Sequence, residues 1–488
     1  MYRRRARAHW RPAESQPNAH LSKGALAIPN PDYSALVAAQ REFFLTGATR
    51  PASWRKAQLQ AVKAMFTENR NELYDALWKD LRRNAFDAEM IDVGLSAKNA
   101  DYVSEHLDRW MEPERVHTPL IFEPGHALIR RDPLGVTLII GAWNEPLVTV
   151  FAPVAAAFGA GNVVVVKPSE VSAACSAAVG KLVPKYFDPK VAAVVEGGVP
   201  ETTALLAQKW DFIFFTGSPT VGKIIHQAAA KSLTPCLLEL GGKNPTIVHS
   251  SANLEVAARR IAYGRYTNTG FFCTAPDHVL VWSEVKDAFI GHLLEAIHEF
   301  YGDDPKVSPD YGRVINHRNF DRLVRLLASG KVAVGGQTDA KELYIAPTVL
   351  VDVSPESPIM QEEVFGPILP VLEIDSVEAV IQSVNSRPPA LGVYVFAEDA
   401  SVVERILDAT VSGTGCVNEC TVQPFVTDLP FGGVGNSGMG RYRGRAGFEA
   451  LTNTRGVMYH SARIDPALRY PPYAKHPLES RIEAKLAP

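Results

Sequence analysis

The stretch VTLIIGAWNEPLVTVFAPVAAAFGAGNVVVVKPSE, residues 136–170, decides the fold because it alternates between two kinds of secondary structure. Its ends, residues 136–143 and 162–169, are short apolar runs rich in β-branched side chains, which favour strands. Residues 147–161 between them are almost entirely apolar and end in a glycine-containing turn, as is typical of a buried helix. The stretch therefore predicts a strand–helix–strand unit that is buried on both faces.

The segment from Pro146 to Val166 carries no charge over 21 residues, which is long enough to cross a bilayer. Proline and glycine interrupt it, however, and its last four residues are all valine, which prefers a strand. We interpret the segment as a buried helix, a tight turn and a buried strand, and we expect no integral membrane segment.

The same alternation continues toward the C-terminus as far as residue 242. Apolar strands are predicted at residues 191–198, 211–218 and 235–242, with helices between them. Near-continuous apolar strands separated by helices indicate a parallel sheet covered by helices on both faces. Such sheets bind ligands beyond the carboxyl ends of their strands, so the turns after these strands form the candidate site.

Further segments extend this pattern in both directions. Residues 33–110 carry apolar side chains at helical spacing. Two short alternating runs between Pro113 and Asp132 predict a hairpin or arm. A second α/β pattern occupies residues 243 to 425, with strands predicted at 245–250, 278–282, 344–353 and 366–374.

From these patterns we predict an α/β protein with two domains, preceded by a basic leader that we expect to be disordered. The second domain carries Cys273, and two further segments form bridging elements. The predicted bounds are 1–30 for the leader, 31–240 and 241–428 for the domains, and 113–132 with 445–475 for the bridging elements.

Composition narrows the class of protein. The chain has 488 residues, too many for a single hydrophobic core, which agrees with two or more domains. Its net charge of −3 gives no general attraction to nucleic acid, so we expect no nucleic-acid partner. Five cysteines cannot form a disulfide framework in a chain of this length, so we expect a reducing, cytoplasmic location.

Two turns after predicted strands carry side chains suited to a dinucleotide. In FTGSPTVGK, Gly217 and Gly222 flank the start of a helix, whose free backbone N–H groups favour a pyrophosphate. The spacing is neither the Rossmann nor the Walker fingerprint, so a plain tight turn is the alternative. In KPSE, Lys167 can hold a ribose or phosphate oxygen and Glu170 a ribose hydroxyl, although this motif taken alone favours a solvated turn.

Three further residues are candidates for catalysis. Glu239 stands between two leucines at a strand end, where burial raises the pKa of a carboxyl toward that of a general base; a buried pair with Lys243 is the alternative. Asn144 offers a neutral amide donor for an oxyanion, or merely forms a turn. Cys273, in NTGFFCTAP, is either a nucleophile or one more buried apolar residue.

The sequence does not predict a metal site. The 13 histidines show no HExxH or paired spacing. Cys416 and Cys420 are spaced as CxxxC without a second pair, which argues against zinc. His278 is a possible base, but nothing in the sequence orients it.

Taken together, the motifs occur in one characteristic order: GAWNEP, KPSE, FTGSPTVGK, LELGGK, a cysteine 34 residues after Glu239, EEVFGPILPV (362–371) and LPFGGVGNSGMG (429–440). In this order they resemble the aldehyde dehydrogenase superfamily, and most closely its class 3 branch, the fatty and aromatic aldehyde group. The resemblance extends from about residue 33 to 460. It implies a parallel Rossmann-type NAD(P)-binding domain, an α/β catalytic domain and a small oligomerisation arm, joined in a homodimer.

The resemblance also implies a role for each candidate. Cys273 matches the nucleophile, Glu239 the general base and Asn144 the oxyanion donor, in a reaction that passes through a thiohemiacetal and a thioester to a carboxylic acid. The implied cofactor is NAD, with NADP possible, because Glu170 repels a 2′-phosphate. The positions that match cofactor contacts are Trp143, Lys167, Glu170, Gly217, Ser218, Gly222, Glu363 and Phe365.

The sequence departs from the class 3 pattern beside the nucleophile. Phe271 and Phe272 replace Gln-Thr, Glu145 replaces a tyrosine, and His278 replaces another. We predict that Glu145, Phe271 and Phe272 line the substrate site and that the two phenyl rings shape an apolar tunnel for a medium- or long-chain or aromatic aldehyde. Two alternatives stay open: a cofactor-binding protein with impaired dehydrogenase activity, and a thiol esterase that uses the same cysteine.

Overall fold

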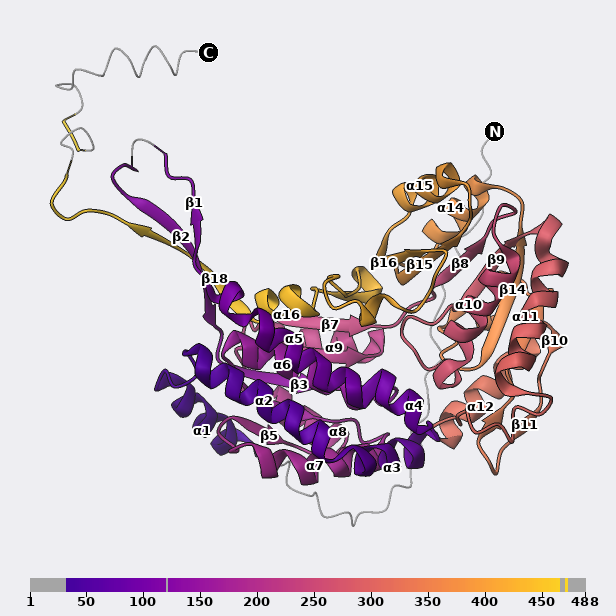
Figure 1. Ribbon diagram of the computed structural model, residues 1–488, viewed down its shortest axis with the longest axis horizontal. Helices are drawn as coiled ribbons and strands as arrows, with labels where there is room; N and C mark the ends of the chain where they lie inside the picture. Colours follow the sequence, from indigo (N-terminus) through magenta and orange to yellow (C-terminus); the bar gives the residue numbers. More distant parts are fainter. Residues whose placement is uncertain (1–31, 120–121, 466–469, 473–488) are drawn as a thin grey trace, which may run out of the picture.

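The computed structural model describes residues 32–119, 122–465 and 470–472. Two α/β lobes lie side by side, and a β-arm projects from the first lobe on the side away from the second (Figure 1). The predicted basic leader, residues 1–30, lies outside the described residues, as does part of the predicted bridging element 445–475.

The first lobe contains a six-stranded sheet in the order β17-β7-β6-β3-β4-β5, parallel except for β17. Helices connect its strands, so the predicted parallel sheet is confirmed. The strands are β3 (Val136–Ile140), β4 (Val163–Lys167), β5 (Ala192–Val194), β6 (Phe212–Gly217), β7 (Cys236–Leu240) and β17 (Gly438–Met439), and the connecting helices are α6 (Val148–Ala160), α7 (Ala173–Tyr186), α8 (Val199–Leu206) and α9 (Pro219–Ala230).

Strand β3 shows why this sheet is buried on both faces. Val136, Leu138 and Ile140 belong to the hydrophobic cluster shared with α1, α8 and α9, whereas Ile139 belongs to the cluster shared with α6. Successive side chains of a strand point to opposite faces, so an unbroken apolar run requires cover on each side. Helix α6 ends at Gly161, whose φ of 86° lies in the left-handed region, and the chain then enters β4.

The helices that come before the sheet in the sequence form a layer that covers one of its faces. The helices that pack on α6 and α7 are α2, α3 and α5, as Figure 1 shows. A π-helix, η1, lies directly before α5. The elements are α1 (Ser34–Leu45), α2 (Ala52–Glu68), α3 (Arg70–Leu81), α4 (Ala85–Asp87), η1 (Ala88–Val93) and α5 (Gly94–Met111).

The second lobe contains a seven-stranded sheet in the order β10-β13-β14-β9-β8-β15-β16, parallel except for β10. Four of its strands were predicted, but β10, β15 and β16 were not. The strands are β8 (Pro245–Val248), β9 (His278–Trp282), β10 (Lys331–Val334), β13 (Thr348–Val351), β14 (Ile368–Ile374), β15 (Ala390–Phe396) and β16 (Ser412–Val417); the helices are α10 (Leu254–Tyr266), α11 (Lys286–Tyr301), α12 (His317–Leu326), α13 (Pro358–Gln361), α14 (Val377–Asn385) and α15 (Ala400–Ala409).

The arm is a three-stranded antiparallel sheet in the order β1-β2-β18. Strands β1 (Glu114–Val116) and β2 (His126–Pro133) form the predicted hairpin, and β18 (Thr452–Tyr459) joins it after helix α16 (Gly444–Ala450). The oligomerisation role of the arm stays a prediction. Among the described residues, no helix combines the length and the apolar character that crossing a membrane requires.

Candidate active site

Cys273 lies in a tightly constrained loop after α10. The helix ends at Tyr266, and Asn268 and Thr269 then take left-handed backbone angles, with φ of 51° and 54°. Gly270 also has a positive φ, and a Cβ atom there would lie 2.3 Å from the carbonyl oxygen of Gly366. Glycine is therefore required at this position, where the cysteine loop approaches the loop that precedes β14.

The loop that carries Cys273 is fixed from the second lobe by Asn244. Its Nδ2 donates hydrogen bonds to the carbonyl oxygens of Cys273, at 2.7 Å, and Ala275, at 3.0 Å. The side chain of Cys273 is only partly buried, unlike that of Cys175 in the core of helix α7. Two backbone anchors beside a partly exposed thiol hold the sulfur in one place without enclosing it.

Glu239 lies in β7 and is 1% exposed. Neither of its carboxylate oxygens has a hydrogen-bond partner among the residues that the structure describes. Lys243 instead pairs with Asp277 and donates to the carbonyl oxygens of Ile359 and Glu362, so the alternative of a Glu239–Lys243 pair is wrong. Burial raises the pKa of Glu239 well above its ordinary value, and the charge of Glu145 raises it further.

The thiol of Cys273 shares this environment. Burial raises the pKa of Cys273 well above its ordinary value, and Glu239 and Glu145 add to the effect, while Arg443 opposes it. Cys273, Glu239 and Glu145 are therefore close enough to influence one another's protonation. An additional negative charge at this point of the molecule is unfavourable, so a proton tends to remain on one of them.

Asn144 follows β3 and faces the cysteine loop. Its side-chain Nδ2 donates to the carbonyl oxygen of Phe271, at 2.8 Å, and to Oε2 of Glu145, at 3.2 Å. Both Asn144 and Glu145 are buried, and burial, followed by the charge of Asp92, raises the pKa of Glu145 to about 7. The structure thus brings the predicted amide donor and the loop of the predicted nucleophile into direct contact.

The residues predicted to hold a dinucleotide lie at the carboxyl ends of neighbouring strands. Lys167 ends β4, where its buried ammonium pairs with the half-exposed Glu170. Gly217 ends β6, and Ser218 caps α9 by accepting a hydrogen bond from the N–H of Val221. This places a buried cation, a half-exposed acid and the first turn of a long helix along one sheet edge, which fits a dinucleotide.

Gly222 contributes through its lack of a side chain. A Cβ atom there would lie 2.7 Å from Leu240 Cδ2, so the glycine lets α9 approach β7. The first turn of α9 is thereby held near the sheet edge that carries Glu239.

The loop that carries Glu363 and Phe365 closes this region from the second lobe. The ring of Phe365 packs against Trp143, at 5.3 Å between centroids, and Phe271 lies 5.0 Å from the same indole. The Glu363 carboxylate lies over Gly241, and burial raises the pKa of Glu363 to about 8. The predicted cofactor contacts Trp143 and Phe365 are therefore neighbours across the two lobes.

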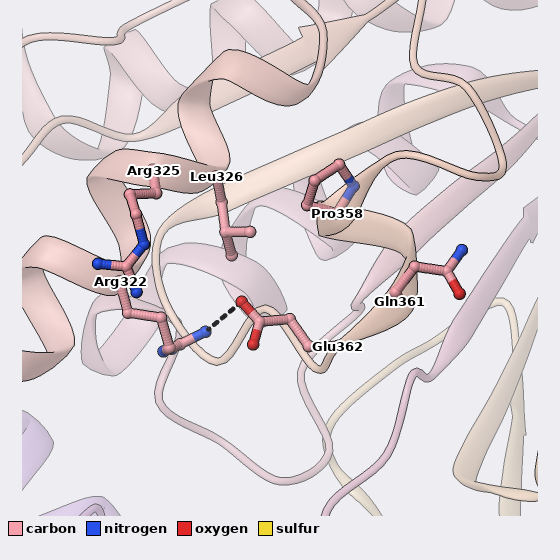
Figure 2. A pocket seen from close by; sticks show the side chains of 6 residues that line it. All are labelled: Arg322, Arg325, Leu326, Pro358, Gln361 and Glu362. Atoms are coloured by element: carbon pink, nitrogen blue, oxygen red, sulfur yellow. Dashed lines mark ion pairs between the residues drawn. The ribbon is translucent and has the colours of Figure 1, made fainter. Parts of the chain in front are cut away.

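A cavity of about 440 Å³ opens beside this loop (Figure 2). In it, Arg322 forms an ion pair with Glu362, at 3.6 Å. Its guanidinium also donates to the carbonyl oxygens of Val364, at 2.9 Å, and Phe365, at 3.0 Å. Arg322, which lies in α12, thus fixes the backbone that follows Glu363. The residues that line the cavity are Arg322, Arg325, Leu326, Pro358, Gln361 and Glu362.

The two phenylalanines before Cys273 point to different surroundings. Phe271 is fully buried and packs with Trp143 and Phe365, in the hydrophobic cluster of the second lobe. Phe272 forms a small separate cluster with Ile91 of η1 and with Ala275. The predicted role of both rings in lining the substrate site stays a prediction, and the structure gives them distinct neighbours.

His278, considered as a possible base, is buried in β9. Its Nδ1 lies 3.7 Å from a carboxylate oxygen of Asp277, and burial lowers the pKa of His278. Asp277 is already engaged by Lys243. His278 therefore belongs to a buried network with Asp277 and Lys243. Within the described ranges, no group of three or more His, Cys, Asp or Glu side chains is arranged to hold a metal ion.

Sequence reasoning missed three charged residues near the site. Arg83 and Asp92 form a fully buried ion pair beside Asn144. Arg443 is 5% exposed, and its Nε and Nη1 have no hydrogen-bond partner among the described residues. No motif or spacing marks these positions, because each reaches the site only through the folding of distant segments.

Comparison with known proteins agrees with this arrangement. The Aldehyde dehydrogenase family model matches residues 10–457. Human aldehyde dehydrogenase family 3 member B1 is 45% identical over 446 residues, which cover 91% of this chain and 95% of that protein. The mouse protein "Aldehyde dehydrogenase, dimeric NADP-preferring" is 43% identical over 441 residues, covering 90% of this chain and 97% of that protein.

Solved structures give the same answer. The structure described as the "Substrate bound state of Staphylococcus Aureus AldH" superposes with a TM-score of 0.90 at 38% identity, over 93% of this chain and 99% of that one. The predicted fold class and the resemblance to class 3 are therefore confirmed. The chain belongs to the aldehyde dehydrogenase family and oxidises aldehydes to carboxylic acids with NAD or NADP.

Proposed function

We propose that Cys273 is the nucleophile, Glu239 the general base and Asn144 the oxyanion donor for a medium- or long-chain or aromatic aldehyde. The observation that carries this assignment is Glu239: a buried carboxyl, without any hydrogen-bond partner among the described residues, that influences the protonation of Cys273. A buried polar group normally has a hydrogen-bond partner. A buried carboxylate without one, close to a thiol, is therefore suited to accept a proton during the reaction.

In the first step the Cys273 thiol gives its proton to the Glu239 carboxylate and its sulfur forms a bond to the aldehyde carbon. The π-electron pair of the carbonyl bond moves to the oxygen, which takes up the negative charge. The Nδ2 of Asn144 donates to that oxygen once it leaves the carbonyl oxygen of Phe271, its present acceptor at 2.8 Å. Loss of one such donor typically raises the barrier by about 3–4 kcal/mol.

The thiohemiacetal carbon then loses a hydride, for which a bound nicotinamide cofactor would be the acceptor, and becomes the carbonyl carbon of the thioester. The side chains that hold the cofactor in our proposal come from both lobes, with Lys167 and Glu170 at the adenosine ribose and the start of α9 at the phosphates. Trp143, Glu363 and Phe365 complete the site at the nicotinamide end. Gly217, Ser218 and Gly222 lie at the start of α9 and contact the phosphates in our proposal, and the lack of a side chain at Gly222 lets α9 approach β7.

Hydrolysis of the resulting thioester requires water and a base. The pKa of Glu239 is raised by burial, so its carboxylate takes a proton from water more readily than an exposed glutamate does. The product is then the free carboxylic acid, and the thiol of Cys273 is restored.

The substrate class follows from the apolar side chains beside Cys273. Phe272 and Ile91 lie together, and nothing in that cluster offers a hydrogen bond to a substrate tail. We also propose a cytoplasmic homodimer in which the β-arm takes part. The dimeric mouse relative supports the homodimer, and five free cysteines in the described part of the chain support a reducing compartment.

The test is a panel of hexanal, decanal and benzaldehyde with NAD, followed by the absorbance of NADH. We expect NADH with each aldehyde and none from Cys273→Ala. NAD binding without NADH formation from any aldehyde would favour the alternative of an impaired cofactor-binding protein. Ester hydrolysis that requires Cys273 in the absence of aldehyde oxidation would favour the thiol esterase.

A further inference from the structure

Arg83 is a buried cation between two parts of the site that are distant in sequence. It follows α3 by two residues, and its neighbour Arg82 has a left-handed φ of 52°. Arg82 points to solvent, where it pairs with Glu342, whereas the side chain of Arg83 is 1% exposed. The turn after α3 therefore directs the second of two consecutive arginines inward.

The guanidinium of Arg83 has acceptors on three different segments. Its Nη2 donates to the main-chain oxygen of Asn144, at 2.6 Å, and to Oδ1 of Asn268, at 2.7 Å. Its Nη1 pairs with the carboxylate of Asp92 in η1. A planar guanidinium with several donors in fixed directions is suited to hold three acceptors at once.

Asn268 extends this network to the cysteine loop. Its Nδ2 donates to the main-chain oxygens of Asn144 and Phe271, both at 3.1 Å. The carbonyl oxygen of Phe271 also accepts from the Asn144 side chain. Asn268 has the left-handed backbone described above, which costs energy for a residue other than glycine and persists only where its surroundings hold it.

Asp92 extends the network in the other direction. Its Oδ1 accepts hydrogen bonds from the backbone N–H groups of Leu147, at 3.0 Å, and Val148, at 2.8 Å. These groups open helix α6, only a few residues after Asn144. One buried ion pair thus fixes the main chain at Asn144 and at the start of α6, and the π-helix that supplies Asp92 is of a kind often found at functional sites.

A buried ion pair is a poor source of stability, because the desolvation of both charges offsets their attraction. The ion pair instead fixes the positions of other groups, since the contacts described above are all to the segment of Asn144 or to the loop of Cys273. We infer that Arg83 is a positioning residue that holds the Asn144 amide in register with the Cys273 loop. This inference rests on the proposed roles of Asn144 and Cys273.

The test is a double-mutant cycle of Arg83→Met and Asn144→Ala, measured as kcat/KM for decanal at saturating NAD. Removing an oxyanion donor costs about 10²–10³-fold, so we expect that loss from Asn144→Ala. We expect Arg83→Met to lose about 10-fold or more, with KM for NAD unchanged, and to add little in the Asn144→Ala background. Arg83→Lys keeps the charge and should recover part of the loss.

The matched control is Arg55→Met. Arg55 is also buried and donates to two main-chain oxygens, those of Thr49 and Gly159, at the opposite end of α6 from Asn144. We expect it to lower the melting temperature without lowering kcat/KM. Equal losses of kcat/KM in the two methionine variants, or losses from Arg83→Met and Asn144→Ala that multiply fully, would overturn the inference.

Asn268→Gly gives a second route if Arg83→Met does not fold. Glycine accepts the left-handed backbone, and the variant leaves the Arg83–Asp92 pair intact while removing its bridge to Phe271. It should reproduce the loss of kcat/KM, and wild-type kcat/KM in this variant would count against the inference. If Asn144→Ala itself retains wild-type kcat/KM, the proposed oxyanion role fails, whatever Arg83 does.

Discussion

The carboxylate of Glu145 accepts a hydrogen bond from the side-chain amide of Asn144, at 3.2 Å between Oε2 and Nδ2. The predicted oxyanion donor is therefore shared between an acid beside it and the carbonyl oxygen of Phe271. In the proposed mechanism, an acid at this position brings a negative charge close to the substrate oxygen that becomes negatively charged during the reaction. Because the pKa of Glu145 is raised to about 7, the charge appears within the working pH range.

Glu145→Gln should speed the alkylation of Cys273 by iodoacetamide in a pH-dependent way. Above pH 7 the ionised Glu145 raises the pKa of the thiol, so its removal should lower that pKa and give several-fold faster reaction at pH 8. At pH 6 Glu145 is protonated, and the two proteins should react alike. Equal rates at both pH values would contradict the effect, and Glu342→Gln, at an exposed acid, serves as the control.

Arg443→Met should change the same rate in the opposite direction. The guanidinium opposes the rise in the pKa of Cys273, so its removal should raise that pKa and slow alkylation at pH 8. The melting temperature should not fall, because two nitrogens of this buried group lack partners among the described residues and an apolar replacement relieves that cost. Arg443→Lys keeps the charge and should alkylate nearly as fast as the wild type.

Much of the first lobe could be predicted, because its strands are continuous apolar runs bounded by turn residues. The segment 136–170 folds as expected, and the candidate residues of this lobe lie at or just after the carboxyl ends of β3, β4, β6 and β7. Strands β15 and β16 were missed, since both are interrupted by glycine, at Gly392 and at Gly413 and Gly415, and glycine weakens a strand pattern.

The network around Asn144 could not be predicted in the same way. Arg83, Asn144 and Asn268 are far apart in the sequence, and their contacts depend on how α3, β3 and α10 pack. The same holds for Lys243, which is four residues from Glu239 but pairs with Asp277. Local patterns place such residues on elements, whereas the choice of partner is decided by tertiary packing.

Gly241→Ala should weaken cofactor binding without unfolding the protein. A Cβ atom at Gly241 would lie 2.2 Å from Oε2 of Glu363, the end of a flexible side chain that can move away. We expect KM for NAD to rise about 10-fold, equivalent to about 1.4 kcal/mol, if Glu363 contacts the cofactor. The control is Gly291→Ala in α11, where a Cβ meets nothing within 4 Å. A KM for NAD equal to that of the control would contradict the role of Glu363.

Glu170→Gln should shift the choice between the two cofactors. Glu170 is half-exposed at the end of β4 and pairs with the buried Lys167. Its negative charge repels a 2′-phosphate and its oxygen accepts from a 2′-hydroxyl, so the neutral amide should favour NADP and release Lys167 for the phosphate.

Solvent screens an exposed charge, and we expect a change of about 1 kcal/mol, a roughly fivefold rise in the ratio of kcat/KM for NADP to that for NAD. The measurement is the initial rate of decanal oxidation over a range of each cofactor. Glu342→Gln breaks a comparable surface ion pair, with Arg82, and should leave the ratio unchanged. A ratio that stays constant in Glu170→Gln as well would mean that this carboxylate does not face the adenosine ribose. A carboxylate beside the 2′ position would repel the 2′-phosphate of NADP, so its removal would have to change the ratio.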